Sequence, residues 1–136
     1  MKVKEIMHPA TKVPSDTTIS EAARIMDQKL IGSVLIEENN KTIGIMTERD
    51  ILRKIVAKGI NPDKTKVKHI MSYPIITIDI NEDVMEASKK MDQNRIRRLV
   101  VTEKGKIIGK VTVNSIARNF KYALARSMSA YTRPDY

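Results

Sequence analysis

The sequence of 136 residues contains no cysteine, no tryptophan, one phenylalanine and two histidines. The absence of cysteine excludes a disulfide scaffold, a thiolate zinc site and a cysteine nucleophile. Two histidines leave little room for a histidine-based metal site, and no nucleophile–base pair stands out, so we expect neither an enzyme nor a metal site. No apolar run approaches the roughly 18 residues of a membrane span, and the N-terminus lacks the apolar core of a signal peptide. We therefore expect a soluble cytoplasmic protein.

Acidic residues are also scarce, 16 against 25 Lys and Arg, and the formal net charge is +9. The excess is uneven: residues 1–64 carry 11 basic and 9 acidic side chains, whereas residues 65–136 carry 14 and 7. A basic half indicates nucleic acid, a membrane surface or a small anionic ligand, or it is simply a solvated surface. The charge by itself does not decide among these alternatives.

The chain contains an internal duplication. Residues 3–7 recur as residues 67–71, and a constant offset of 65 then pairs residues 9–51 with residues 74–116. Of these 43 pairs 13 are identical, and several of the others exchange one aliphatic side chain for another. Chance does not sustain one offset over such a length, so the sequence consists of two copies of one unit.

Each copy has the pattern of a β-α-β-β-α unit. In the first copy, Thr18 and Glu21 fit the capping box of a helix between the first two strands. The expected elements are strands at 11–13, 33–36 and 42–46, joined by the polar loop 37–41, and a second helix at 48–57 whose apolar face is Ile51, Leu52, Ile55 and Val56. The second copy predicts strands at 75–78, 99–102 and 106–111, a turn at 104–105, and helices beginning near residues 84 and 113.

A unit of about 55 residues cannot bury its sheet face alone, so the two copies should pack against each other. The predicted fold is mixed α/β (α+β), with two tandem repeats related by pseudo-twofold symmetry. The expected division is repeat one at 1–60, a linker at 61–66, repeat two at 67–122 and a basic tail at 123–136.

The two copies differ in charge after their third strands. Thr47 and Asp50 fit a helical capping box, whereas the second copy has Thr112 and Ser115. A pure capping role tolerates this one-sided loss of the acid without explaining it. A helix start at a sheet edge also offers free N–H groups, and a carboxylate there accepts two hydrogen bonds from a vicinal diol such as ribose. Both interpretations, cap and ribose anchor, stay open at this point.

A second difference lies at the start of the middle strand, where Arg97 and Arg98 replace Gly32 and Ser33. Arginines beside a cleft can bind phosphate oxygens in a bidentate manner, although a basic edge also discourages aggregation. In a pseudo-twofold pair, the acid of one copy and the bases of the other can meet in one cleft.

The order and spacing of these features resemble the tandem CBS-domain pair, or Bateman module, over residues 1 to about 120. The matching features are Ile6-Met7, Val13 followed by Pro14 to Ile19, Glu21-Ala22, Met26, the aliphatic strand 34–36, and Gly44-Ile45-Met46-Thr47-x-x-Asp50. The resemblance implies a stand-alone regulatory module rather than an enzyme. It also implies an adenosine-type regulatory ligand (AMP, ADP, ATP or S-adenosylmethionine), with no required cofactor.

The resemblance further implies that Asp50 binds the ribose, Thr47 the ribose or phosphate, and Arg97 and Arg98 the phosphates. It places the purine against Ala10, Thr11, Lys12, Val13, Pro14 and Ile45. Because Ser115 breaks the motif, we expect one competent site and a second that is weak or empty.

The expected partners are a second copy of the chain, in a homodimer, and an unidentified regulated protein, with no membrane. The alternative function is nucleic-acid binding through the basic C-terminal half, where the segment 118–126 would extend the last helix and expose Arg118, Lys121 and Arg126. The other interpretation of this segment is a C-terminal helix that packs against a partner subunit.

Overall fold

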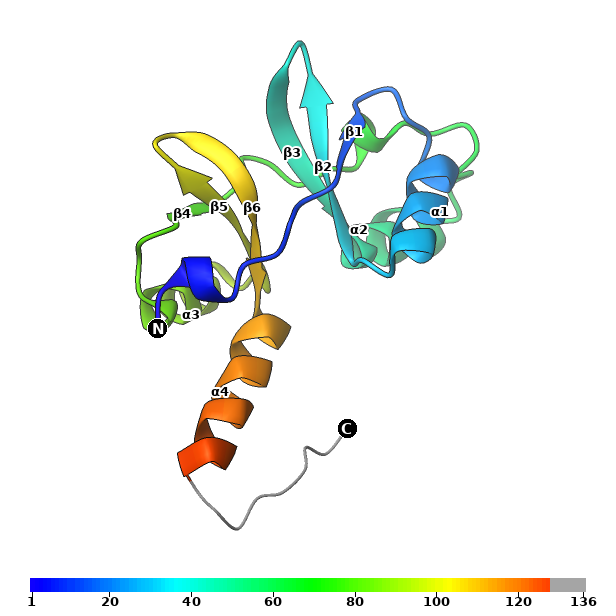
Figure 1. The fold of residues 1–136 in the computed structure, drawn as a ribbon. Helices are drawn as coiled ribbons and strands as arrows, with labels where there is room; N and C mark the ends of the chain where they lie inside the picture. The colour runs from blue at the N-terminus through cyan, green and yellow to red at the C-terminus, as the bar shows by residue number, and fades with distance from the viewer. Residues whose placement is uncertain (128–136) are drawn as a thin grey trace. The chain divides into compact units, whose positions relative to one another are not determined.

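A computed structural model describes the backbone of residues 1–127 and the side chains of residues 1–120. Its element order is two successive β-α-β-β-α repeats, each with its own three-stranded sheet. This order, shown in Figure 1, confirms the predicted mixed α/β fold. Residues 128–136 of the expected basic tail, and the side chains of Lys121 and Arg126, lie outside the described residues.

In the first repeat, β1 runs parallel to β2, and β2 runs antiparallel to β3. The helix between β1 and β2 begins after Thr18, whose Oγ1 accepts a hydrogen bond from the amide of Glu21 at 3.2 Å, as the capping residues predict. The elements are β1 (Lys12–Pro14), α1 (Ile19–Lys29), β2 (Ser33–Glu38), β3 (Lys41–Thr47), α2 (Glu48–Ile51) and a π-helical turn (Leu52–Val56).

The second repeat has the same topology, with β4 parallel to β5 and β5 antiparallel to β6. Its last helix continues to Ser127, which confirms the expected extension of that helix through residues 118–126. The elements are β4 (Thr77–Asp79), α3 (Val84–Asn94), β5 (Arg98–Glu103), β6 (Lys106–Thr112) and α4 (Val113–Ser127).

The turns between the antiparallel strands are two residues long. Lys104 and Gly105 have φ values of 50° and 79°, at the predicted turn. In the first repeat the turn is Asn39-Asn40, with φ values of 51° and 62°, so the expected loop at 37–41 was too long. Asparagine tolerates positive φ, which lets the strands continue up to the two central residues of a tight hairpin.

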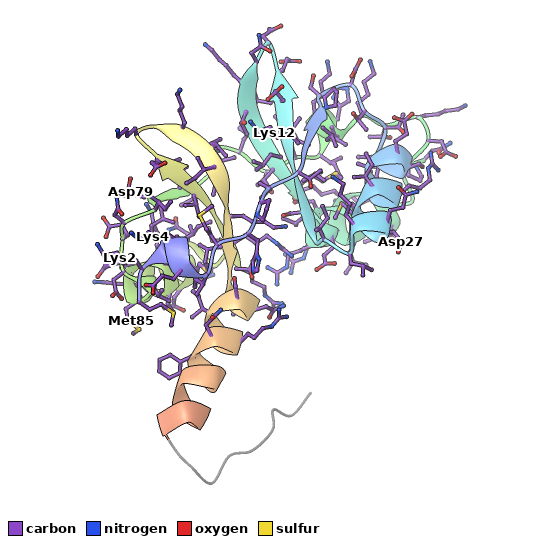
Figure 2. The ribbon with its side chains drawn as sticks, in the orientation of Figure 1. Lys2, Lys4, Lys12, Asp27, Asp79 and Met85 are labelled. Carbon is purple, nitrogen blue, oxygen red and sulfur yellow. The ribbon has the colours of Figure 1, made fainter. Side chains whose placement is uncertain are left out.

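The compact units do not coincide with the repeats. The first-repeat unit is Ala10–Ile75, and the second-repeat unit combines Met1–Pro9 with the chain from Ile76 onward. Each unit therefore contains the leading 3₁₀ turn of the other repeat, Val3–Glu5 or Val67–His69. Figure 1 shows the blue N-terminal turn beside elements of the second repeat, and Figure 2 labels Lys2 and Lys4 there.

Equivalent backbone hydrogen bonds hold the two leading 3₁₀ turns in their units. The Val67 amide donates to the Thr17 carbonyl at 2.8 Å, and the Val3 amide donates to the Glu82 carbonyl at 2.9 Å. Glu82 is the residue of the second repeat that is equivalent to Thr17. Both valines are fully buried in the core of their unit. The first core is Val13, Ile19, Ala22, Met26, Val34, Ile36, Met46, Ile55, Val67 and Ile70, and the second is Val3, Ile6, Ile78, Val84, Ala87, Met91, Leu99, Val101 and Val111.

The expected apolar face of the second helix is divided between the core and the surface. Ile55 is buried and Ile51 packs against the core, but Leu52 is 60% exposed and Val56 is 66% exposed. After Ile51 the helix changes to π-helical bonding, with the Ala57 amide donating to the Leu52 carbonyl. The wider turn shifts the following side chains around the helix axis, so the α-helical spacing no longer holds.

Candidate functional site

Thr47 and Asp50 lie where β3 ends and α2 begins, and they form the predicted capping box. Asp50 Oδ2 accepts hydrogen bonds from the Thr47 amide at 2.9 Å and from Thr47 Oγ1 at 3.2 Å. In return the Asp50 amide donates to Thr47 Oγ1 at 3.2 Å. One carboxylate oxygen of Asp50 is therefore fully used by the helix cap.

The other oxygen of Asp50 holds two side chains that sequence reasoning did not connect with it. Asp50 Oδ1 accepts a hydrogen bond from Ser72 Oγ at 3.0 Å and forms an ion pair with Lys54 Nζ at 3.0 Å. Lys54 Nζ also donates to the Ile70 carbonyl at 2.8 Å. A carboxylate has about four acceptor positions, so the carboxylate of Asp50 is saturated within its own unit.

The second repeat builds the same cap without the acid. Ser115 Oγ accepts from the Thr112 amide at 2.9 Å, and the Ser115 amide donates to Thr112 Oγ1 at 3.1 Å. At the position equivalent to Lys54 stands Asn119, whose side-chain amide donates to the Ser115 backbone carbonyl at 2.7 Å. A hydroxyl is thus enough for the cap, and the charge of Asp50 is not required for it.

Gly44 and Gly109 occupy equivalent positions in the two repeats, and each is in close contact with the leading segment of the other repeat. A Cβ on Gly44 would lie 2.5 Å from Met71 Sδ and 2.9 Å from the Ser72 carbonyl oxygen. A Cβ on Gly109 would lie 2.5 Å from the His8 carbonyl oxygen. These distances are too short for any side chain, so both glycines allow the leading segment of the other repeat to cross the sheet edge.

The arginines lie in the second-repeat unit. Arg97 is exposed, and its carbonyl accepts the first amide of α4, from Val113, at 3.0 Å. Arg98 is half-buried at the start of β5, opposite Thr112. The structure therefore brings both arginines beside the Ser115 cap of their own unit. Because Asp50 belongs to the other unit, the meeting of acid and bases in one cleft stays a prediction.

Lys110 is a further cation that sequence reasoning missed. It pairs with Val100 in the β5–β6 ladder, two positions from the pair of Arg98 and Thr112, so Lys110 and Arg98 share one face of the sheet. Lys110 is only 8% exposed. Burial, and then the charge of Arg98, lower the pKa of its ammonium group below the usual 10.5. A lysine at the position of Ile45, in an otherwise aliphatic strand, was the available signal.

The expected purine positions lie on both edge strands of the first sheet, residues 10–14 on and just before β1 and Ile45 on β3. Val13 is in the core, so only its backbone remains for a ligand. Lys12, labelled in Figure 2, is exposed on β1 and lies 3.7 Å from Glu37, measured between Nζ and Oε2. Ala10, Thr11 and Ile45 are half-buried, Pro14 is exposed, and the Thr11 carbonyl is occupied by the Leu35 amide at 2.8 Å. The purine assignment stays a prediction.

The part of the chain that the structure describes contains no group of three His, Cys, Asp or Glu side chains able to hold a metal ion. Within the same residues, no helix is both long enough and apolar enough to span a bilayer.

The comparisons with known proteins agree with the repeats. The family model of the CBS domain matches residues 3–57 and 67–122. The chain belongs to the CBS-domain family and is a tandem CBS pair, a regulatory module.

An uncharacterized protein from Methanopyrus kandleri is 38% identical over 116 residues, which cover 85% of this chain and 59% of that protein. This chain thus spans less than two thirds of the length of that relative. A CBS-domain protein from Pyrobaculum aerophilum, solved in complex with AMP, is 26% identical with a TM-score of 0.79 over 93% of this chain and 99% of its own. A hexameric CBS-CP12 protein from bloom-forming cyanobacteria is 25% identical, with a TM-score of 0.83. The match covers 91% of this chain and 73% of that protein.

Proposed function

We propose that this CBS pair is a sensor that binds one adenine nucleotide, with Asp50 and Thr47 at the ribose. The observation that carries the proposal is the comparison of the two caps. Ser115 caps its helix with a hydroxyl, so the carboxylate of Asp50 exceeds what a cap requires. A carboxylate suits a vicinal diol, because it accepts two hydrogen bonds and donates none. The AMP bound to the Pyrobaculum relative supports the ligand class.

The phosphates are assigned to Arg97, Arg98 and Lys110. Arg98 and Lys110 lie on one sheet face, and their mutual repulsion contributes to the lowered pKa of Lys110. An anionic ligand would relieve both this repulsion and the cost of burying the lysine charge. Lys110 thereby extends the pair of arginines expected from the sequence into a three-cation set.

A regulatory module acts on other proteins, so we assign this chain a homodimeric state and a regulated partner protein. Leu52 and Val56, which follow the Thr47–Asp50 cap, and Phe120 on α4 are exposed apolar side chains suited to such contacts. The hexamer of the cyanobacterial neighbour supports self-association. Sedimentation equilibrium would test the oligomeric state.

The test of the ligand is a thermal-shift panel of AMP, ADP, ATP, S-adenosylmethionine and adenosine, because a ligand of the native state raises its melting temperature. For a ligand that binds, calorimetry on Asp50→Ala should show at least about tenfold weaker binding, since one charge-assisted hydrogen bond contributes about 1.5–3 kcal/mol. Asp27→Ala, which removes an exposed carboxylate from α1 of the same unit, is the control and should keep the wild-type affinity. Unchanged affinity in Asp50→Ala would contradict the ribose assignment.

The same calorimetry tests the phosphate assignment. Combined substitution Arg97→Ala with Arg98→Ala should weaken AMP and ATP more than adenosine, because adenosine lacks phosphate. Equal losses for all three ligands would show that the arginines do not contact phosphate.

The second candidate function, nucleic-acid binding, is favoured by the exposed Arg97 and Arg118 of the basic second-repeat unit. Retention of DNA or RNA that falls steeply with salt would support it. No retention at low salt would exclude it.

A further inference from the structure

Asp50 is buried beneath side chains that are themselves at the surface. Asp50 is 7% exposed, whereas the Lys54 side chain is 41% exposed and Ser72 is exposed. Both contact the same oxygen, Oδ1, at 3.0 Å. The cover of this carboxylate therefore consists of two side chains that can move into solvent without opening the core.

The two covering side chains also hold a particular segment, residues 70–72, which belongs by sequence to the second repeat. Ser72 contributes its hydroxyl, and its backbone pairs in both directions with Ile45 at 2.8 and 3.0 Å. Lys54 joins Asp50 to the Ile70 carbonyl. The chain leaves the first-repeat unit after Ile75, three residues beyond Ser72. We call Asp50, Lys54 and Ser72 the Asp50 latch.

The second-repeat unit has the same backbone pairing without a latch. His8 pairs in both directions with Lys110 at 2.9 and 2.8 Å, as Ser72 does with Ile45. Among the residues whose side chains the structure describes, Ser115 Oγ bonds only to Thr112. The two leading segments therefore pair with the sheets in the same way through their backbones. Side-chain contacts to a carboxylate are found for residues 70–72, in the unit that contains Asp50.

A vicinal diol needs two acceptor positions on a carboxylate, and those on Asp50 Oδ2 are held by the cap. We propose that the ligand and residues 70–72 compete for Asp50 Oδ1, so that ligand binding opens the latch and loosens the segment leading to the second-repeat unit, which then keeps only its backbone pairing and the core contact of Ile70. This proposal rests on the proposed function for the ligand and on the geometry alone for the latch. Lys54 and Ser72 are positioning residues of that segment.

The latch itself is tested without ligand, by amide hydrogen exchange on the full chain. Lys54→Met and Ser72→Ala should each speed exchange at the Ser72 and Ile45 amides about tenfold, because each removes one bond to a carboxylate. Asn119→Ala, at the equivalent of Lys54, is the control and should leave the His8 and Lys110 amides unchanged. Unchanged exchange in both latch variants would overturn the latch.

The competition is tested by the sign of a change in affinity, with AMP as the probe. Ser72→Ala removes a competitor for Oδ1 and should tighten AMP binding about threefold to tenfold. Weaker or equal binding would overturn the competition and indicate that Ser72 only orients Asp50. If AMP binds neither the wild type nor Ser72→Ala, both the assignment of AMP as the ligand and its competition for Oδ1 are wrong. The hydrogen-exchange result then tests the Asp50 latch independently of any ligand.

Discussion

The turn after β3 and the turn after β6 have the same backbone and different charge. Both are closed by a threonine and a residue three positions later, and both are crossed by the leading segment of the other repeat. In the first repeat the residue three positions after the threonine is Asp50, which contacts Lys54 and Ser72. In the second repeat it is Ser115, and the basic residues Arg97, Arg98 and Lys110 lie near it in the same unit. The duplication thus preserved the scaffold and divided the charges.

The largest loss of stability is expected from substitutions at Gly44 and Gly109, where the leading segments approach the sheets most closely. Gly109→Ala should lower the free energy of unfolding by about 3 kcal/mol, because the new Cβ meets the backbone oxygen of His8. Gly44→Ala, the matched variant, should cost about 2 kcal/mol, because its nearest obstacle is the flexible Met71 side chain and the backbone oxygen it meets, that of Ser72, is further away, at 2.9 Å against 2.5 Å for His8. Urea unfolding measures both values. A larger loss for Gly44→Ala would contradict the difference between the crossings.

An intermediate effect should separate the two caps. A double-mutant cycle of Asp50→Ser and Lys54→Met should give a coupling free energy of about 1.5 kcal/mol, because either change removes the same ion pair. The equivalent cycle of Ser115→Ala and Asn119→Ala should be additive, since Asn119 binds the backbone of Ser115 and not its hydroxyl. Urea unfolding supplies the four free energies of each cycle. Equal coupling in the two cycles would remove the distinction.

The smallest effect concerns Lys110, a buried cation whose pKa is shifted. Burial and Arg98 lower the pKa of Lys110 in the folded state below 10.5, so protonated Lys110 opposes folding at neutral pH. Lys110→Met should therefore raise the free energy of unfolding by about 1 kcal/mol at pH 7. Since the unfolded chain binds more protons between the two pKa values, wild-type stability gains in that window, and the advantage of the variant should shrink as the pH approaches 10.5.

The control for this pH series is Ile45→Met at the equivalent strand position, whose effect should not depend on pH. Chemical denaturation at several pH values provides the measurement. A constant advantage of Lys110→Met over the whole series, or a loss of stability at pH 7, would contradict the unfavourable burial of the charge.

Much of the fold was predictable because its signals are local. The capping residues Thr18 and Thr47 act within one helical turn, and the turn at Lys104-Gly105 needs two residues. The sequence pattern marks the apolar face of the second helix without showing which part of it reaches the core: Ile55 is buried, whereas Leu52 and Val56, in the π-helical turn, are exposed. For the candidate site, the asymmetry of Asp50 and Ser115 was visible, whereas Lys54 and Ser72 were not associated with it.

The amino-acid sequence by itself determined the duplication, the order of elements, the CBS family and the division of charge between the copies. These properties are carried by spacing and by contacts within a few residues. Only the tertiary structure decided which repeat receives each leading turn, why Gly44 and Gly109 have no side chain, and what covers Asp50. Ser72 lies 22 residues from Asp50, and Gly109 lies far from His8 along the chain. No local pattern marks such contacts, because they form only when folding brings distant segments to the same sheet edge.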